Sequence, residues 1–154
     1  MLGEEHPSTL TSMDNLASTF WNQGRWKEAK ELGVQVMETR KRVFGEEHPD
    51  TLTSIANLAS TYSNQGRWKK AEELKVQVME TRKRVLGEEH PDTLTSISNL
   101  AFTFKAQGRN DEAILLMEKC FQPQKKVLGA HHPYTTLSLT TLNGWQLETV
   151  EIRI

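Results

Sequence analysis

The sequence predicts an all-α fold built from 42-residue helix-turn-helix repeats. Residues 2–43 are identical to residues 44–85 at 33 of 42 positions, and a fixed period of this size is typical of repeat architectures. Within each period, apolar residues recur at the three- and four-residue spacing of amphipathic helices. Each repeat of such an array packs on its neighbours, so we expect function on an extended surface rather than in a buried catalytic pocket.

The first helix of each repeat is expected to begin at a His-Pro pair. Proline suits the first helical position because it has no N–H to leave unpaired, and an acid such as Asp50 suits the positive helix end. In the middle repeat, Leu52, Ile55 and Leu58 then follow at helical spacing. The same pattern predicts first helices near 7–22, 49–64, 91–106 and 133–142.

The second helix of each repeat is expected after a turn of about three residues. Gly66 can adopt the left-handed conformation that ends the preceding helix, and Trp68 opens the next apolar pattern. The pattern predicts second helices near 26–43, 68–85 and 110–122. A turn this short makes the two helices of a repeat antiparallel. Pro123 is expected to end or kink the third of them, because proline removes a backbone donor and clashes with the preceding turn.

The boundaries follow from the period. The array is expected to span residues 1–142, as repeats 2–43, 44–85 and 86–127 and a half repeat 128–142, followed by a non-repeat tail over 143–154. Met1 precedes a repeat boundary directly, which suggests a fragment of a longer array. In the tail, Val150, Ile152 and Ile154 alternate, which indicates an extended segment. We expect this tail to fold back as a C-terminal cap over the apolar run 114–117.

The small and aromatic residues of the middle repeat carry a family resemblance; they are Ala59, Tyr62, Gly66, Trp68 and Ala71. The pattern resembles the tetratricopeptide repeat. The chain resembles the kinesin light chain type of this repeat in its 42-residue period, its linker 86–92 and its segment 57–68. Its near-identical tandem copies are also similar to the repeat regions of fungal NB-ARC proteins. The resemblance implies a right-handed α-α superhelix whose first helices line a concave groove.

Two positions on the second helix depart from the family pattern. The large residue usual in its middle is Gly33, Lys75 or Met117 in successive repeats, and the small residue one turn later is Val36, Val78 or Cys120. These changes are expected to alter packing between helices and not the fold.

A peptide-binding groove is expected on the first helices. At two positions, the type of side chain changes from one repeat to the next: Asp14, Ala56 and Ser98 at the first, and Trp21, Ser63 and Lys105 at the second. At a third position, asparagine recurs unchanged, as Asn15, Asn57 and Asn99. The resemblance implies that these positions line the groove, where constant amides could bond the backbone of an extended peptide. The alternatives are amides that bridge adjacent helices and neutral drift on an exposed face. The expected groove residues are Thr11, Asp14, Asn15, Ser18, Trp21, Asn22, Thr53, Ala56, Asn57, Ser60, Ser63, Asn64, Thr95, Ser98, Asn99, Phe102 and Lys105.

Other function classes find little support. The net charge of −1 gives no bulk attraction to nucleic acid or to a membrane surface. Each repeat boundary carries histidine, but successive copies lie one repeat apart, so helix capping is favoured over a metal site. The single cysteine, Cys120, falls at a core position. We expect no cofactor, no metal and no catalysis, and a cytoplasmic location.

The sequence therefore predicts a protein–protein interaction scaffold that binds a peptide segment of a partner in the groove. The alternative is a structural module that self-associates end to end, because an uncapped array end exposes apolar positions to another chain.

Overall fold

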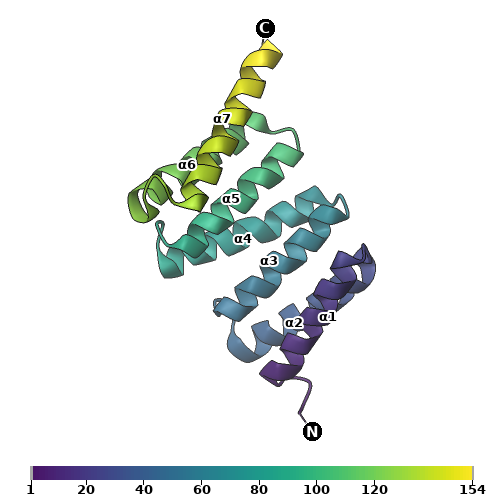
Figure 1. Cartoon of the computed structure of the whole chain (residues 1–154). Coiled ribbons are helices and arrows are strands. Elements are labelled where there is room, and N and C mark those ends of the chain that lie inside the picture. The colour runs from purple at the N-terminus through teal and green to yellow at the C-terminus, as the bar shows by residue number, and fades with distance from the viewer. Residues whose placement is uncertain (1, 154) are drawn as a thin grey trace. The chain divides into compact units, whose positions relative to one another are not determined.

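The computed structural model describes residues 2–153, and the side chains of residues 2–152 (Figure 1). The described part of the chain contains seven helices and no strand. They are α1 (Pro7–Asn22), α2 (Trp26–Phe44), α3 (Pro49–Asn64), α4 (Trp68–Leu86), α5 (Pro91–Ala106), α6 (Asn110–Leu128) and α7 (Pro133–Arg153). None of these helices is both long and apolar enough to cross a lipid bilayer.

The first helices begin where the sequence predicts, and histidine caps them. The Nδ1 atoms of His6, His48 and His90 accept hydrogen bonds at 3.1 Å from the backbone N–H two residues later. His132 does the same at 3.2 Å in front of α7. Each bond satisfies one N–H that has no partner within the helix. The expected capping role of these four histidines is thereby confirmed.

The turn within each repeat depends on a glycine with positive φ. Gly66 follows α3 with φ of +74°, a conformation that residues with a Cβ rarely adopt. The Arg67 N–H then donates to the Tyr62 carbonyl at 2.9 Å, which closes the helix end. Gly24 and Gly108 have the same conformation in the other two complete repeats. The short turn brings α3 back against α4, where Leu58, Tyr62 and Ala71 form a buried cluster.

The chain divides into two compact units at Val78 and Met79, within α4. In the first unit, α2 packs against both α1 and α3. Leu52 and Ile55 of α3 are buried there with Val78. In the second unit, α6 packs against both α5 and α7, and Met117 and Cys120 of α6 are buried. Each unit therefore has a core formed between successive helix pairs.

Pro123 does not end the second helix of the third repeat. Helix α6 continues through it to Leu128, six residues beyond the predicted end at 122. The bond that proline removes would have joined its N–H to the carbonyl of Lys119, and Lys119 lies on the exposed side of the helix. Cys120 and Gln124, on either side of Pro123, are buried. Packing of the buried face of α6, which includes Met117 and Cys120, offsets the hydrogen bond and the steric clash that proline costs.

The tail is helical, so the extended segment expected there is wrong. Helix α7 does not end near residue 142 but runs through Asn143-Gly144 to Arg153, and Ile154 lies outside the described residues. Trp145, just after this pair, is buried at 7% exposure and packs edge-on against Phe102 at 5.2 Å. Glycine within a helix costs about 1 kcal/mol, and burial of an indole ring more than offsets this cost. Leu115, which the cap was expected to cover, remains exposed.

Candidate functional site

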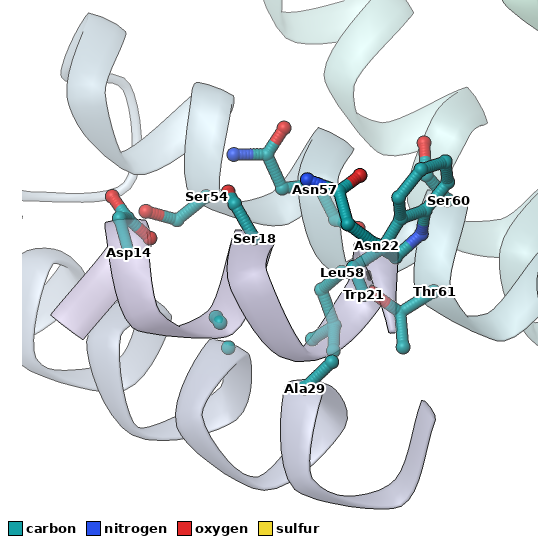
Figure 2. A pocket seen from close by; sticks show the side chains of 12 residues that line it. Asp14, Ser18, Trp21, Asn22, Ala29, Ser54, Asn57, Leu58, Ser60 and Thr61 are labelled. Atoms are coloured by element: carbon teal, nitrogen blue, oxygen red, sulfur yellow. Dashed lines mark hydrogen bonds between the residues drawn. The ribbon is translucent and has the colours of Figure 1, made fainter. Parts of the chain in front are cut away.

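A pocket of about 310 Å³ opens in the first unit between α1, α2 and α3. Its walls come from α1 and α3, and α2 supplies its floor through Ala29 and Gly33. Figure 2 shows Asp14 and Ser54 at one end and Trp21 and Ser60 at the other, with Asn57 and Asn22 between them. The pocket therefore runs along α1, over the two helical turns that separate Asp14 from Trp21, about 10 Å.

Six of the expected groove residues in the first unit line this pocket: Asp14, Ser18, Trp21, Asn22, Asn57 and Ser60. The other six, Thr11, Asn15, Thr53, Ala56, Ser63 and Asn64, lie on the same two helices but do not line it. Six lining residues were not in the expected set: Ala17, Ala29, Gly33, Ser54, Leu58 and Thr61. The departure of Gly33 from the family pattern was the signal that could have located the floor.

Asp14 is neutralised within the protein. Its Oδ2 accepts a hydrogen bond from Nη1 of Arg40, and the same guanidinium nitrogen donates to Ser54 Oγ at 2.7 Å. Arg40 is only 7% exposed. Arg40, which lies on α2, therefore joins α1 and α3 through these two bonds. The acidic end of the pocket therefore carries an ion pair and no free negative charge.

The recurring asparagines have free side chains. Asn15, Asn57 and Asn99 are exposed, and none of their side-chain amides has a hydrogen-bond partner in the described part of the chain. In the first unit, the alternative in which Asn15 and Asn57 bridge α1 and α3 therefore finds no hydrogen bond to support it. Asn57 lies at the pocket, where both its donor and its acceptor are open to solvent.

Trp21 forms the aromatic end of the pocket. Trp21 is 38% exposed, and its ring contacts Trp26 edge-on, with ring centroids 5.5 Å apart. The Trp26 contact holds the indole in place, while its other surface remains available. Trp21 is therefore only partly packed against its own chain.

In the second unit, α7 engages two of the expected groove residues. Phe102 contacts the Trp145 ring, and Nζ of Lys105 lies 2.5 Å from Oε2 of Glu148 and 3.1 Å from Oδ1 of Asn110. Thr95 and Asn99 remain exposed, and Ser98 is half-buried. The last helix of this chain thus already contacts the positions at which the sequence predicts a ligand, and the first unit offers the more open surface.

The lining of the pocket contains no histidine or cysteine, and its one acid, Asp14, is paired with Arg40. Across the described residues, no three His, Cys, Asp or Glu side chains converge in a way that could hold a metal ion. Cys120 is completely buried, and its thiol donates to the Leu94 carbonyl at 3.4 Å. Burial raises the pKa of the Cys120 thiol to about 11, although a hydrogen bond with Ser138 opposes the shift. This thiol is a core group.

We expect Cys120 to resist alkylation in the folded protein. A pKa raised from 9.0 to about 11 lowers the thiolate fraction about a hundredfold near neutral pH, and burial adds a steric barrier. Iodoacetamide labelling at pH 8, followed by mass spectrometry, should therefore be at least a hundredfold slower for the native chain than for the chain in guanidinium chloride. Equal rates in the two conditions would contradict the buried placement of this thiol.

The chain is similar to known repeat proteins in both sequence and structure. The family model for the tetratricopeptide repeat matches residues 9–83 and 54–126, which together cover most of the chain. No curated protein matches it.

Solved structures give the same result. The nearly identical TPR-like repeats of a Podosopora anserina protein named as a kinesin light chain are 36% identical, with a TM-score of 0.81 over 96% of this chain and 72% of that one. A single-substitution variant of those repeats is 33% identical, with a TM-score of 0.81 over 98% of this chain and 73% of that one.

A more distant structure supports the fold alone. BtubC (BKLC) from P. vanneervenii is 18% identical, with a TM-score of 0.83 over 94% of this chain and 58% of that one. Together these matches confirm the predicted fold class of all-α helix-pair repeats. The chain belongs to the tetratricopeptide repeat family and is a repeat array of the kinesin light chain type.

Proposed function

We propose that this chain binds a peptide segment of a partner protein along α1 and α3, with the pocket over Gly33 at the centre of the contact. Tetratricopeptide repeats are generally non-catalytic protein-interaction scaffolds. The observation that carries the proposal is the free, exposed amide of Asn57 beside an open pocket of about 310 Å³. A buried or internally bonded amide would not be available to a ligand.

The pocket offers the two kinds of contact that peptide recognition needs. The carboxamides of Asn22 and Asn57 can each donate to a peptide carbonyl and accept from a peptide N–H, whatever the side chains. In the same pocket, the exposed face of Trp21 and the side chain of Leu58 provide apolar surface. The amides can hold a peptide backbone, and the apolar surface can select one of its side chains. Together these contacts favour an extended peptide over a small polar metabolite.

The charges around the pocket favour a ligand without a strong net charge. Asp14 is paired with Arg40, so neither side chain offers an uncompensated charge to the pocket. Binding should therefore depend weakly on salt, unlike recognition that is steered by charge.

We expect Asn57→Ala to weaken peptide binding by about 1–3 kcal/mol, because the buried peptide groups that the amide pairs would lose their partner. Peptides selected from a random display library on the whole chain provide the probe, and titration calorimetry gives the dissociation constant. Asn57 is exposed and makes no internal side-chain bond, so the melting temperature should not fall.

Gln35→Ala is the matched control for this experiment. Gln35 is an exposed side chain on α2 that does not line the pocket, so its loss should leave binding unchanged. If the selected peptides bind Asn57→Ala as tightly as they bind the parent chain, or if Gln35→Ala weakens them equally, the proposed binding face is wrong.

A second candidate function is end-to-end self-association, and the surface of α7 favours it. Leu137, Leu147 and Ile152 are 62%, 64% and 76% exposed. Exposed apolar side chains in this number on one helix are typical of an interaction surface. Sedimentation velocity at several concentrations tests this candidate. A concentration-dependent increase in sedimentation coefficient that Leu147→Glu abolishes would support it, and a constant monomer would exclude it.

A further inference from the structure

Three equivalent positions in the second helices hold very different side chains. Gly33, Lys75 and Met117 follow one another at the 42-residue period. Met117 is 1% exposed and fills its place in the core of the second unit completely. Lys75 is half-buried, with its Nζ 3.5 Å from Ser63 Oγ. At the first of these positions there is no side chain, and the pocket takes up the space instead.

Glycine is not required at position 33 by its backbone or by crowding. Gly33 lies in the middle of α2 and is not among the glycines with positive φ. A Cβ at this position would meet Leu58 Cδ1 at 3.5 Å, which is ordinary van der Waals contact. Glycine within a helix costs about 1 kcal/mol relative to alanine. The consequence of this glycine is an empty part of the pocket above it, here called the hollow. In the other two complete repeats, the side chains of Lys75 and Met117 stand at the equivalent position.

We propose that the hollow over Gly33 receives one unbranched apolar side chain of the methionine type from the partner peptide. This inference rests on the proposed function and adds the side chain that the peptide must supply. The side chains that occupy the equivalent place in the chain itself, Lys75 and Met117, are both long and unbranched. A peptide methionine would thus reproduce from outside the packing that Met117 provides from within.

The lining of the hollow selects an apolar over a cationic side chain. Ala17, Ala29 and Leu58 form its inner surface. The acid at its rim, Asp14, is already paired with Arg40, so no free carboxylate is present to meet a lysine or arginine. Methionine suits such a site because its flexible thioether chain fits an irregular apolar gap.

The peptide side of the inference is tested with synthetic peptides derived from the display selection. We expect the selected sequences to share one methionine or similar unbranched apolar residue. Replacement of that methionine by norleucine, its unbranched isostere, should change the dissociation constant by less than about threefold. Replacement by alanine should weaken binding about 10- to 100-fold, because the hollow is left empty. Valine should also weaken it, because its branch at Cβ does not reach the floor.

The protein side is tested with Gly33→Met, which places in the first repeat the residue that occupies the third. This variant should bind the methionine peptide at least tenfold more weakly, because its own side chain fills the hollow. Its melting temperature should equal or exceed that of the parent chain, since a better helix former replaces glycine. Gly33→Ala is the graded comparison: it gains the same helix propensity but fills only part of the hollow, so its loss of affinity should be several-fold smaller than that of Gly33→Met.

The outcomes separate this inference from the proposed function. If peptides bind in an Asn57-dependent way but Gly33→Met binds them as well as Gly33→Ala does, the hollow does not receive a side chain and the inference is overturned, while the proposed function stands. If the parent chain selects β-branched or charged residues at the position that Gly33→Met affects, the methionine-type specificity is overturned. If no peptide is bound by the parent chain, the proposed function fails and the inference fails with it.

Discussion

Arg40→Met should lower the free energy of unfolding by about 2–3 kcal/mol. The guanidinium of Arg40 joins Asp14 of α1 to Ser54 of α3, and it is buried. Its removal leaves the Asp14 carboxylate without a counterion in a site where that side chain is only 22% exposed. Removal of one partner of a fully buried pair costs about 3–5 kcal/mol, and the partial exposure of Asp14 reduces this value. Urea unfolding followed by circular dichroism measures the change.

The chain contains its own control for this experiment. Arg82 is the equivalent residue in the second repeat and donates to Ser96 Oγ at 2.8 Å, but Ala56 stands where the first repeat has Asp14. Arg82→Met removes this bond and a longer one, at 3.5 Å, to the Asp92 carbonyl, but it strands no charge, so it should cost about 1 kcal/mol. The double variant Asp14→Ala with Arg40→Met should be more stable than Arg40→Met alone. Equal losses for Arg40→Met and Arg82→Met would show that the ion pair contributes nothing specific.

The positions of the helices could be predicted because their signals are local. The ends of α1, α3 and α5 agree with the predicted ranges 7–22, 49–64 and 91–106. A His-Pro pair provides both the cap and the first helical residue, and a glycine such as Gly66 supplies the positive φ that ends the helix. These residues act within a few positions of themselves, so a single repeat contains the information needed to locate them.

The errors occurred where contacts distant in sequence outweigh a local rule. Pro123 and Gly144 are both unfavourable in a helix, yet α6 and α7 continue through them. The residues that hold these helices, such as Cys120 and Trp145, pack against partners more than twenty residues away. Local propensity amounts to about 1 kcal/mol for glycine and about 3 kcal/mol for proline, and tertiary packing of large side chains exceeds the first and offsets the second.

The candidate site could be predicted only in part, because some of its contacts join residues that are distant in sequence. Comparison between repeats identified Asp14 and Trp21, because these positions change chemistry from one repeat to the next, and the pocket includes both. The comparison did not reveal that Asp14 is paired with Arg40, since the two lie 26 residues apart on different helices. The family pattern marked Gly33 as an unusual residue but did not predict a pocket above it. A missing side chain leaves a hollow only where no neighbouring side chain fills the space.

Deletion of residues 144–154 should destabilise the second unit by about 3–5 kcal/mol. The segment includes Trp145, which is 7% exposed and packs against Phe102, and removal of a buried tryptophan side chain has a cost of this order. It also includes Glu148, whose carboxylate pairs with Lys105. The deletion would leave Phe102, already 46% exposed, without its aromatic partner, so the truncated chain should also associate more readily.

A shorter deletion separates the buried contacts from the length of α7. Removal of residues 150–154 leaves Trp145 and Glu148 in place and takes away Val150 and Ile152, which are 56% and 76% exposed. This variant should melt within about 2 °C of the parent chain, because it loses little buried surface. Trp145→Ala in the full-length chain should reproduce most of the destabilisation caused by the longer deletion. If instead both deletions lower the melting temperature equally, the exposed end of α7 contributes to stability through contacts with another chain, and self-association becomes the better account of this helix.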